Sequence, residues 1–282
     1  MKRSSNQLAI DCSRVTDLIC QFIQARVRNA GANGVVVGIS GGIDSALTAF
    51  LCKRALGSER VLGILSPETA TPTADIEDAE LVVRHLGIQS RQMYIDQVVQ
   101  ALSQLMPVET KSLMVLGNIK ARLRMIILYA FANNNGSLVV GTSNKTENMV
   151  GYSTKFGDGA YDFSPIGDLY KTQVIQLAQY VEVPENIITK PPSAGLWPGQ
   201  TDEDELGISY ESLDLILSGL ERWGSVAEIS KNTGLPEEEI TRIRNSVRKS
   251  EHKRQPPVIL KLSYRTSGID WLLPLTTSDS NG

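Results

Sequence analysis

Histidine and cysteine are scarce in this sequence of 282 residues. It contains two histidines and three cysteines, Cys12, Cys20 and Cys52, and no two cysteines have the Cys-x-x-Cys spacing of a zinc or redox site. Without a cluster of His and Cys, a structural zinc site is not expected. We expect the three thiols to be buried or half-buried packing groups.

Long apolar runs and an excess of positive charge are also missing. No apolar run approaches the roughly 20 residues that a membrane helix needs, and the N-terminal segment MKRSSNQLAIDCSRV has no continuous apolar signal core. The formal net charge of -3 and the isoelectric point of about 5.6 give no sign of the basic surface typical of nucleic-acid-binding proteins. We therefore expect a cytosolic protein that binds neither membranes nor nucleic acid.

The sequence does contain strand-like segments that alternate with helical ones. The predicted strands are 34–39, 61–65, 91–95 and one within SLVVGTSN, and the predicted helices are 6–29, one that starts at 44, 73–86, 113–133, one that starts at 171, 209–218 and 236–249. This alternation predicts a doubly wound α/β fold, a mostly parallel sheet with helices on both faces. The length fits a single domain over residues 1–282.

Two long loops and a tail interrupt the pattern. Residues 151–167 are rich in Gly, Asp and Tyr, and residues 190–207 are rich in Pro, Gly and acidic residues. Loops of this length in a compact domain are usually functional lids or disordered segments. The C-terminal tail, residues 262–282, is expected to be flexible.

The string GISGGIDS follows a run of three valines and predicts a strand, a glycine-rich turn and a helix. Gly41 and Gly42 let backbone N–H groups approach a ligand, and the helix dipole adds to them, so the turn predicts an anion site. It has neither the Gly-Lys-[Ser/Thr] ending of a Walker A loop nor the spacing of a dinucleotide fingerprint. Ser40 and Ser45 offer hydroxyl donors. The carboxylate of Asp44 fits a phosphate site only if a cation lies between the carboxylate and the phosphate. The alternative is a turn in which Asp44 and Ser45 merely cap the helix.

The full string resembles the SGGxDS signature of the ATP pyrophosphatase (PP-loop) enzymes, which have the adenine nucleotide alpha hydrolase-like fold. The resemblance implies a loop that holds the β- and γ-phosphates of ATP, cleavage between the α- and β-phosphates, and an adenylated substrate. The residues that it assigns to ATP are Gly38, Ile39, Ser40, Gly41, Gly42, Ile43, Asp44 and Ser45.

Five further segments narrow the resemblance to ammonia-dependent NAD synthetase. They are NIKARLRM at 118–125, GTSNKTE at 141–147, GYSTKFGDGAYDFSPIGDLYKTQV at 151–174, DEDELGISY at 202–210 and EHKRQPP at 251–257, in the family order. The resemblance covers the chain from the first predicted strand to about Pro257. It implies a ligase that forms NAD from deamido-NAD, ATP and ammonia, the last step of NAD biosynthesis.

The resemblance also implies a magnesium site and further ATP contacts. Asp44 and Glu147 follow different strands, and two carboxylates at one edge of a sheet suit Mg²⁺, which keeps waters and bridges phosphates. Thr142 and Lys171 match family residues that contact ATP, and Ser193 keeps a hydroxyl where the family commonly has threonine. Taken alone, Glu147 would be interpreted as a solvated residue of a surface turn, and a solvated lysine stays an alternative for Lys171.

Five residues match family positions that contact deamido-NAD, namely Arg122, Lys155, Asp162, His252 and Lys253. A guanidinium such as that of Arg122 suits the carboxylate and the pyrophosphate of this substrate. Asp162 is in addition a candidate for attracting or deprotonating ammonium. Without the resemblance, Arg122 and His252 would be interpreted as solvated surface residues.

The implied reaction has two steps. A carboxylate oxygen of deamido-NAD attacks the α-phosphate of ATP and pyrophosphate leaves, and ammonia then attacks the acyl carbon and AMP leaves. The catalytic roles fall to Lys171, Asp44 and Asp162, with Lys171 stabilising the extra charge on the α-phosphate. Neither step needs a Ser or Cys nucleophile, and the sequence shows no triad-like arrangement.

The ammonia source and the oligomeric state also follow from the resemblance. Only about 30 residues precede the first predicted strand, so we expect no glutaminase domain, and the ammonia would be free or supplied by a separate protein. The family forms homodimers that share the dinucleotide site, and helices 6–29 and 113–133 are candidate interfaces.

Two other functions stay open at this point. Another PP-loop enzyme, such as a tRNA-thiolating or a GMP-forming one, would share the ATP site, although the former usually brings cysteines or a basic surface. A non-catalytic module that binds adenine nucleotides would release no pyrophosphate, and it would not need Asp44, Glu147 and Lys171 together.

Overall fold

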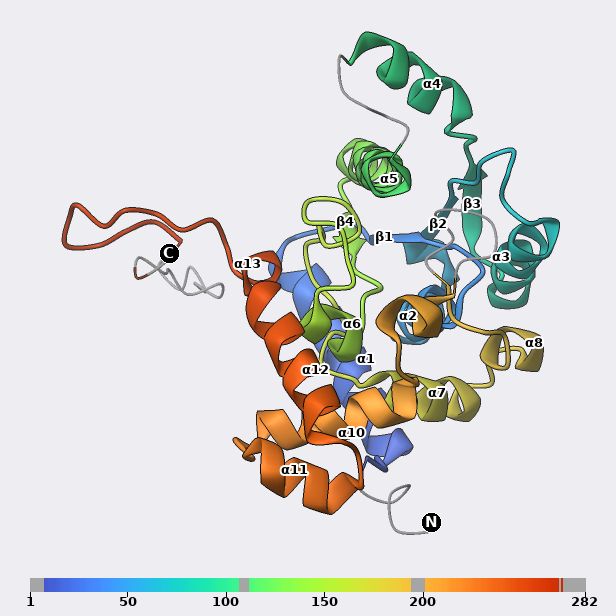
Figure 1. Cartoon of the computed structure of the whole chain (residues 1–282). Coiled ribbons are helices and arrows are strands. Elements are labelled where there is room, and N and C mark those ends of the chain that lie inside the picture. The colour runs from blue at the N-terminus through green and yellow to red at the C-terminus, as the bar shows by residue number, and fades with distance from the viewer. Residues whose placement is uncertain (1–7, 107–111, 194–200, 269, 271–282) are drawn as a thin grey trace, which may run out of the picture.

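The computed structural model describes residues 8–106, 112–193, 201–268 and 270 (Figure 1). In this part of the chain, one parallel sheet has the strand order β3-β2-β1-β4. Its strands are β1 Val35–Gly38, β2 Val61–Leu65, β3 Gln89–Gln92 and β4 Leu138–Val140. Val35 is in register with Val61 on one side and with Leu138 on the other, so β1 is a central strand.

Helices surround this sheet. The longer ones are α1 Cys12–Asn29, α2 Ile43–Leu56, α3 Thr73–Leu86, α4 Asp96–Leu105, α5 Leu113–Asn135, α7 Lys171–Tyr180, α10 Tyr210–Glu221, α11 Val226–Thr233 and α12 Glu237–Lys249. The shorter ones are η1 Ser58–Arg60, α6 Lys145–Val150, α8 Glu185–Ile188, α9 Asp202–Leu206 and α13 Glu251–Arg254. None of the helices in the described ranges is long and apolar enough to cross a membrane.

Side chains of β1 alternate between two apolar layers. Val35 and Val37 belong to a core cluster with residues of α1, α2, α3 and α7, whereas Val36 packs with Val139 of β4 against α5. Because successive side chains of a strand point to opposite faces, helices cover both faces of the sheet. Figure 1 shows α5 on one side of the sheet and α1 and α2 on the other. The predicted doubly wound α/β fold is confirmed.

A separate helical layer supports the sheet domain beyond α6 and α7. Residues of α10, α11 and α12 form their own apolar cluster around the fully buried Leu213, Ile216 and Leu217. The helix α10 packs against both α6 and α7. These two helices begin with the segments that contain Glu147 and Lys171, so the helical layer lies behind two of the predicted site residues.

Several predicted elements have different bounds in the structure. The first helix begins at Cys12 rather than at residue 6, because Asp11 caps it by accepting a hydrogen bond from Arg14 N at 3.0 Å. Two large apolar residues of this helix, Leu18 and Phe22, are 55% and 41% exposed. The third strand lies at Gln89–Gln92 instead of 91–95, since it is a mostly exposed edge strand without an apolar pattern.

Other predictions for the chain have mixed outcomes. The strand 61–65 and the helix 73–86 have the predicted bounds. The segment 151–167 is a loop, whereas the second long loop ends in α9, and its residues 194–200 lie outside the described residues. Cys52 is buried and Cys12 and Cys20 are partly exposed, as expected of packing thiols. Most of the tail, 271–282, lies outside the described residues, so its predicted flexibility stays a prediction.

The turn between β1 and α2 depends on Gly41. Its φ is +82°, a conformation that L side chains rarely adopt, and a Cβ here would lie 2.3 Å from the carbonyl oxygen of Asp75 in α3. Ser45 Oγ ties the turn together, because it accepts from Ser40 N at 3.2 Å and donates to Gly42 O at 2.9 Å. The glycine therefore allows α3 to pack directly against the turn.

Replacing Gly41 by alanine is expected to disturb the turn more than the same change at Gly57. Gly57 has a φ of +83°, but no other described atom lies within 4 Å of its Cβ position. We expect Gly57→Ala to lower the free energy of unfolding by about 1–2 kcal/mol, the cost of the left-handed backbone. Gly41→Ala should lower it further and weaken ATP binding at least about tenfold. Urea unfolding and calorimetric titration with ATP measure both quantities, and equal effects of the two variants would contradict the prediction.

Candidate active site

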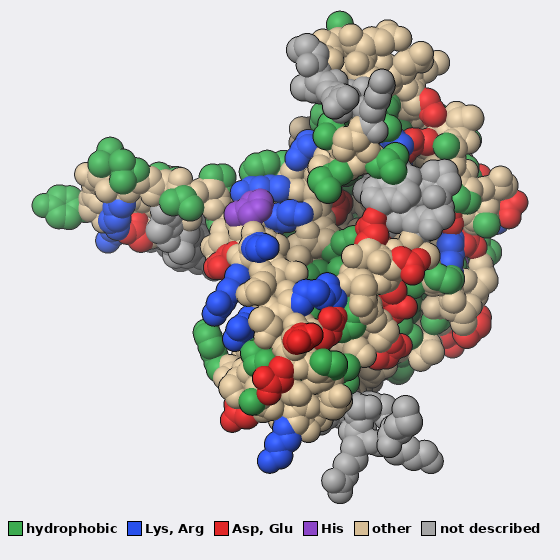
Figure 2. All heavy atoms as spheres, viewed as in Figure 1, with side chains coloured by type: hydrophobic (Ala, Val, Ile, Leu, Met, Phe, Trp, Pro, Cys, Tyr) green, Lys and Arg blue, Asp and Glu red, His purple; other side chains and the backbone are tan. Residues whose placement is uncertain are grey.

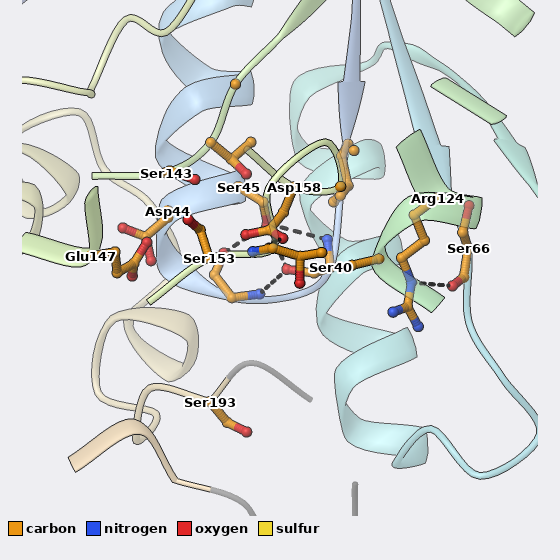
Figure 3. Close-up of a pocket in the computed structure, with 18 of the residues that line it drawn as sticks. Ser40, Asp44, Ser45, Ser66, Arg124, Ser143, Glu147, Ser153, Asp158 and Ser193 are labelled. Atoms are coloured by element: carbon orange, nitrogen blue, oxygen red, sulfur yellow. Dashed lines mark hydrogen bonds between the residues drawn. The ribbon is translucent and has the colours of Figure 1, made fainter. Parts of the chain in front are cut away.

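A cavity of about 830 Å³ opens at the carboxyl ends of β1 and β4 (Figure 3). These strands are neighbours, although the chain passes through β2 and β3 between them, so the strand order reverses at this point. Open α/β sheets bind their ligands at such a switch point. The turn after β1 and the segment after β4 both line the cavity, and both carry residues that the sequence assigns to ATP.

The structure brings together nearly all the residues that the resemblance assigns to ATP. Those that line the cavity are Gly38, Ile39, Ser40, Gly42, Ile43, Asp44, Ser45, Thr142, Lys171 and Ser193. Gly41 is not among the described lining residues, but its carbonyl oxygen accepts from Lys190 Nζ at 3.4 Å. The first residues of α2 thus face the cavity, as an anion site at a helix N-terminus requires.

Asp44, Glu147 and Lys171 meet on one wall of this cavity. Lys171 Nζ lies 2.5 Å from Asp44 Oδ2 and 3.3 Å from Glu147 Oε1. Asn144 Nδ2 donates to Asp44 Oδ1 at 2.9 Å and to Glu147 Oε1 at 2.8 Å. Figure 3 shows the Asp44 and Glu147 carboxylates close to one another. One ammonium and one amide therefore hold two carboxylates side by side.

The local sequence explains how these side chains are placed. Asn144 caps α6, and its Oδ1 accepts from Glu147 N at 3.0 Å in a capping box, so Glu147 both caps the helix and faces the cavity. Asp44 has no capping role, because the cap of α2 is Gly42 without a side-chain hydrogen bond. Lys171 starts α7 and is only 2% exposed, so it is not a solvated lysine.

This wall holds two carboxyl groups and one ammonium, so its charges balance only when a proton or a further cation is present. Burial would lower the pKa of the Lys171 ammonium, but Asp44 and Glu147 raise it above its usual value, so Lys171 stays charged. Burial and then the neighbouring Asp44 raise the pKa of Glu147 to about 8, and Lys171 opposes this rise only in part. Two carboxylates beside one ammonium would accommodate a further cation.

The wall can hold a metal ion only with help from a ligand. Among the described residues, no group of three or more His, Cys, Asp or Glu side chains is arranged to hold a metal ion alone. Asp44 and Glu147 supply two hard oxygen donors, and Mg²⁺ commonly takes one or two carboxylates together with substrate phosphates and waters. The donor set therefore fits Mg²⁺ next to a bound nucleotide.

Four of the five residues assigned to deamido-NAD form one basic cluster beside the cavity. Arg122 Nη2 donates to Lys155 O at 3.2 Å, and Lys155 Nζ donates to His252 O at 2.7 Å. Lys253 Nζ donates to Gly151 O at 2.7 Å and lines the cavity. In Figure 2, Lys and Arg side chains gather around a histidine where α13 lies in Figure 1. The structure thus joins α5, the loop after α6 and α13 into one positively charged surface.

Asp162, the fifth residue, has another position. It is not among the described residues that line the cavity. Its Oδ2 accepts from Val139 N at 2.7 Å and its Oδ1 accepts from Tyr129 OH at 3.3 Å, so it satisfies an N–H group of the edge strand β4. Tyr129 lies about two helical turns beyond Arg122 on α5, which places Asp162 toward the same side as the basic cluster. Its roles toward deamido-NAD and ammonium stay predictions.

Sequence reasoning missed Asp158 and Arg124, which both line the cavity. Asp158 Oδ1 accepts from Thr154 N at 2.8 Å in the glycine-rich loop. Arg124 Nε donates to Ser66 O at 3.1 Å (Figure 3). The signal for Arg124 was its helical spacing. The lining residues of α5 are Met114, Asn118, Ala121, Arg124, Met125 and Leu128, which follow one another at intervals of three or four residues except for the adjacent pair Arg124 and Met125.

A lysine at the start of the second long loop was also missed. Lys190 lines the cavity, and its Nζ lies 2.5 Å from Asp75 Oδ1 and 2.6 Å from Asp78 Oδ2. It therefore joins the loop to α3 and, through Gly41 O, to the turn after β1. No local pattern in the sequence indicated this contact, because its partners are more than 100 residues away.

Comparison with known proteins gives relatives that match most of the chain. The family model described as NAD synthase matches residues 15–257. The NH(3)-dependent NAD(+) synthetase of Methanocaldococcus jannaschii is 49% identical over 245 residues, which cover 86% of this chain and 95% of the relative. The enzyme of the same name from Methanococcoides burtonii is 46% identical over 264 residues, 93% of this chain and 100% of the relative.

Solved structures are similar over the same range. An NH3-dependent NAD synthetase from Campylobacter jejuni, in complex with the nitrate ion, is 37% identical with a TM-score of 0.77 and covers 90% of this chain and 100% of its own. An NMN synthetase from Francisella tularensis is 34% identical with a TM-score of 0.80 and covers 89% of this chain and 99% of its own.

The family match includes each part of the candidate site. It extends from within α1 to the end of EHKRQPP, and so contains the turn after β1, the wall of Asp44, Glu147 and Lys171, and the basic cluster. Identities of 46–49% over most of the chain agree with the sequence motifs and with the fold. This chain belongs to the NAD synthase family.

Proposed function

We propose that this protein is an ammonia-dependent NAD synthetase, which forms NAD from deamido-NAD and ammonia while ATP is cleaved to AMP and pyrophosphate. The observation that carries the proposal is the meeting of Asp44, Glu147 and Lys171 at the switch point of the sheet. The names of the relatives support it, since they match over nearly their full lengths.

ATP would lie with its β- and γ-phosphates in the turn between β1 and α2. The N–H groups at the start of α2 and the hydroxyls of Ser40 and Ser45 offer donors to these phosphates. Asp44 and Glu147 would hold Mg²⁺, which supplies positive charge to the phosphates when it is bound. The bound Mg²⁺ would thus offset the repulsion between the two carboxylates and the phosphates.

Lys171 acts in the first step. A carboxylate oxygen of deamido-NAD forms a bond to the α-phosphorus while the bond to the β-phosphate oxygen breaks, and negative charge grows on the α-phosphate oxygens. A charged and buried ammonium stabilises this growing charge more than it stabilises the ground state. Because Asp44 and Glu147 fix Nζ before the substrate arrives, little reorganisation is needed.

In the second step, ammonia forms a C–N bond to the acyl carbon, the bond to AMP breaks, and the new amide nitrogen loses a proton. The cavity must exclude water here, because water would hydrolyse the adenylate. Both the loop 151–167 and Lys190 at the start of the second loop border the cavity. Asp162, the carboxylate that the sequence nominated for ammonium, and Asp158, which faces the cavity, are the two residues to compare for proton transfer.

The basic cluster would bind the carboxylate and the pyrophosphate of deamido-NAD. It lies at the surface beside α5, where Leu113 and Ile126 are each 56% exposed. Such exposed apolar side chains next to a substrate site support the homodimer that the family resemblance implies. We propose that a second copy covers this face.

Pyrophosphate release tests the proposed function. The purified chain is incubated with ATP, Mg²⁺ and ammonium, with and without deamido-NAD, and NAD formation is followed together with pyrophosphate. We expect release that depends on deamido-NAD and equals the NAD formed. A parallel reaction with nicotinate mononucleotide is the control, because a structural neighbour is named NMN synthetase. If nicotinate mononucleotide is turned over faster than deamido-NAD, the mononucleotide is the substrate and the proposal is wrong. If the protein binds ATP but releases no pyrophosphate, it is a nucleotide-binding module.

Neutralising Glu147 is expected to weaken magnesium binding. Glu147→Gln keeps the capping geometry but removes the charge, so the Mg²⁺ concentration for half-maximal activity should rise about 10- to 100-fold. Glu228→Gln is the matched control, because Glu228 occupies the same capping-box position in α11 and is not among the described residues that line the cavity. Magnesium titrations of activity check this prediction. If Glu147→Gln needs the same Mg²⁺ concentration for half-maximal activity as the wild type, Glu147 is not a magnesium ligand.

Asp162→Asn and Asp158→Asn separate two candidates for handling ammonium. The asparagine at 162 can still accept from Val139 N, so the edge of β4 stays intact. If Asp162 acts on ammonium, its variant should form less NAD per pyrophosphate released, because the adenylate is hydrolysed instead. The ratio of the two products is the measurement. A ratio that falls only in Asp158→Asn would transfer the role to Asp158.

A further inference from the structure

A buried carboxylate, Asp214 of α10, joins the two helices that carry Glu147 and Lys171. It is fully buried and is not among the described residues that line the cavity. Its Oδ1 accepts from Thr146 Oγ1 at 2.5 Å, and its Oδ2 accepts from Thr172 N at 2.8 Å. Thr146 directly precedes Glu147, and Thr172 directly follows Lys171. One side chain therefore binds a chain neighbour of each of these two site residues.

The hydroxyl of Thr146 extends this contact to Lys171 itself. It donates to Asp214 and accepts from Lys171 N at 2.9 Å. The first N–H groups of a helix have no partner within the helix, and Lys171 and Thr172 are the first two residues of α7. Asp214 satisfies one of these groups directly and the other through Thr146, and so it fixes the start of α7.

Burying a carboxylate at this position costs free energy, because the carboxylate loses its contact with water. Its neighbours along α10, Leu213, Ile216 and Leu217, are fully buried apolar residues. Burial raises the pKa of Asp214, and the hydrogen bonds from Thr146 and Thr172 oppose the rise. A buried carboxylate is tolerated when its oxygens are hydrogen-bonded, and here the donors belong to the helices that carry the site.

A second side chain of α10 reaches Lys171 from the same direction. Tyr210 lies one helical turn before Asp214, on the same side of α10. The centre of its ring is 5.1 Å from Lys171 Nζ. The helix α10 therefore contacts Lys171 at its ammonium through Tyr210 and at its backbone through Asp214 and Thr146.

We propose that Asp214 is a positioning residue, which acts through Thr146 to set the place of Lys171 relative to Asp44 and Glu147. The inference rests on the proposed function, because it gives this alignment a role in the attack on ATP. Lys171 and Glu147 project from different helices, and the bonds of Asp214 to Thr146 and Thr172, with that of Thr146 to Lys171 N, connect the starts of both. Glu221 of α10 also bonds side chains at these starts, those of Lys145 and Tyr170, but it reaches neither Lys171 N nor Thr172 N. A misplacement of about 1 Å at a reacting centre can slow a reaction about 100-fold.

The test removes the linking hydroxyl without changing the shape of the side chain. Thr146→Val deletes both hydrogen bonds of Oγ1, and Thr146→Ser keeps them. Thr16→Val is the control for the general cost of a lost buried hydroxyl, since Thr16 is fully buried in α1 and its Oγ1 donates to Cys12 O at 2.7 Å. Each variant is measured for kcat and KM of pyrophosphate release and for its thermal midpoint.

We expect kcat of Thr146→Val to fall about 10- to 100-fold while KM for ATP changes less than about threefold. Thr146→Ser should stay within about threefold of the wild type, and Thr16→Val should lose stability without losing kcat. If Thr146→Val does not fold, Asp214→Asn is measured with the same expectation, because its amide offers Thr146 a donor in place of an acceptor. Wild-type kcat in the folded variant, or an equal loss in Thr146→Ser, would overturn the proposal.

A structural readout separates this inference from the proposed function. If the wild type releases no pyrophosphate, the proposed function fails, and crystal structures of the wild type and of Thr146→Val then test the alignment alone. In the variant, the distance from Lys171 Nζ to Asp44 Oδ2 should exceed the hydrogen-bond limit of about 3.5 Å. An unchanged distance would overturn the positioning role.

Discussion

The contact of the Lys171 ammonium with the carboxylates of Asp44 and Glu147 is the interaction on which the rest of the site depends. It joins three elements, the turn after β1, the segment after β4 and the start of α7. An ammonium that is 2% exposed is stable only beside negative charge, and two carboxyl groups so close together need a cation or a proton between them. The ammonium therefore stabilises the two carboxyl groups, and they in turn stabilise the buried ammonium.

The topology of the sheet makes this contact possible. The chain crosses from β3 back to the far side of β1, so the carboxyl ends of β1 and β4 become neighbours. Asn144 and Asp44, which are 100 residues apart in sequence, hydrogen-bond across this junction. The same reversal leaves space beyond the strand ends, which becomes the cavity. A single feature of strand order therefore produces both the binding space and its charged wall.

The helical layer of α10–α12 has a role that the sheet alone does not explain. Its apolar cluster supports α10, and α10 carries Asp214 and Tyr210 to the start of α7. Buried polar contacts of this kind add little net stability, but they favour one arrangement over similar ones. A site whose groups come from separate helices needs such contacts, because apolar packing by itself tolerates small shifts.

The sequence by itself determined the fold class and the family, and most of the residues that it assigned to ATP line the cavity. Strong local patterns are responsible: the strand 61–65 and the helix 73–86 have the predicted bounds, and the string GISGGIDS has a local geometry that glycine and a helix N-terminus impose. Weak local patterns failed. The edge strand β3 has few apolar residues, so its position could not be read from periodicity.

Only the tertiary structure decided which polar side chains face the cavity. Arg122 and Arg124 stand in one motif, but residues two apart on a helix point to different sides, so Arg124 lines the cavity and Arg122 joins the basic cluster. Likewise, Asp158 faces the cavity whereas Asp162 binds the edge of β4. Asp214 has no motif at all, since its partners Thr146 and Thr172 are 68 and 42 residues away. Hydrogen bonds over such separations depend on how whole elements pack, and no local property of the chain encodes that packing.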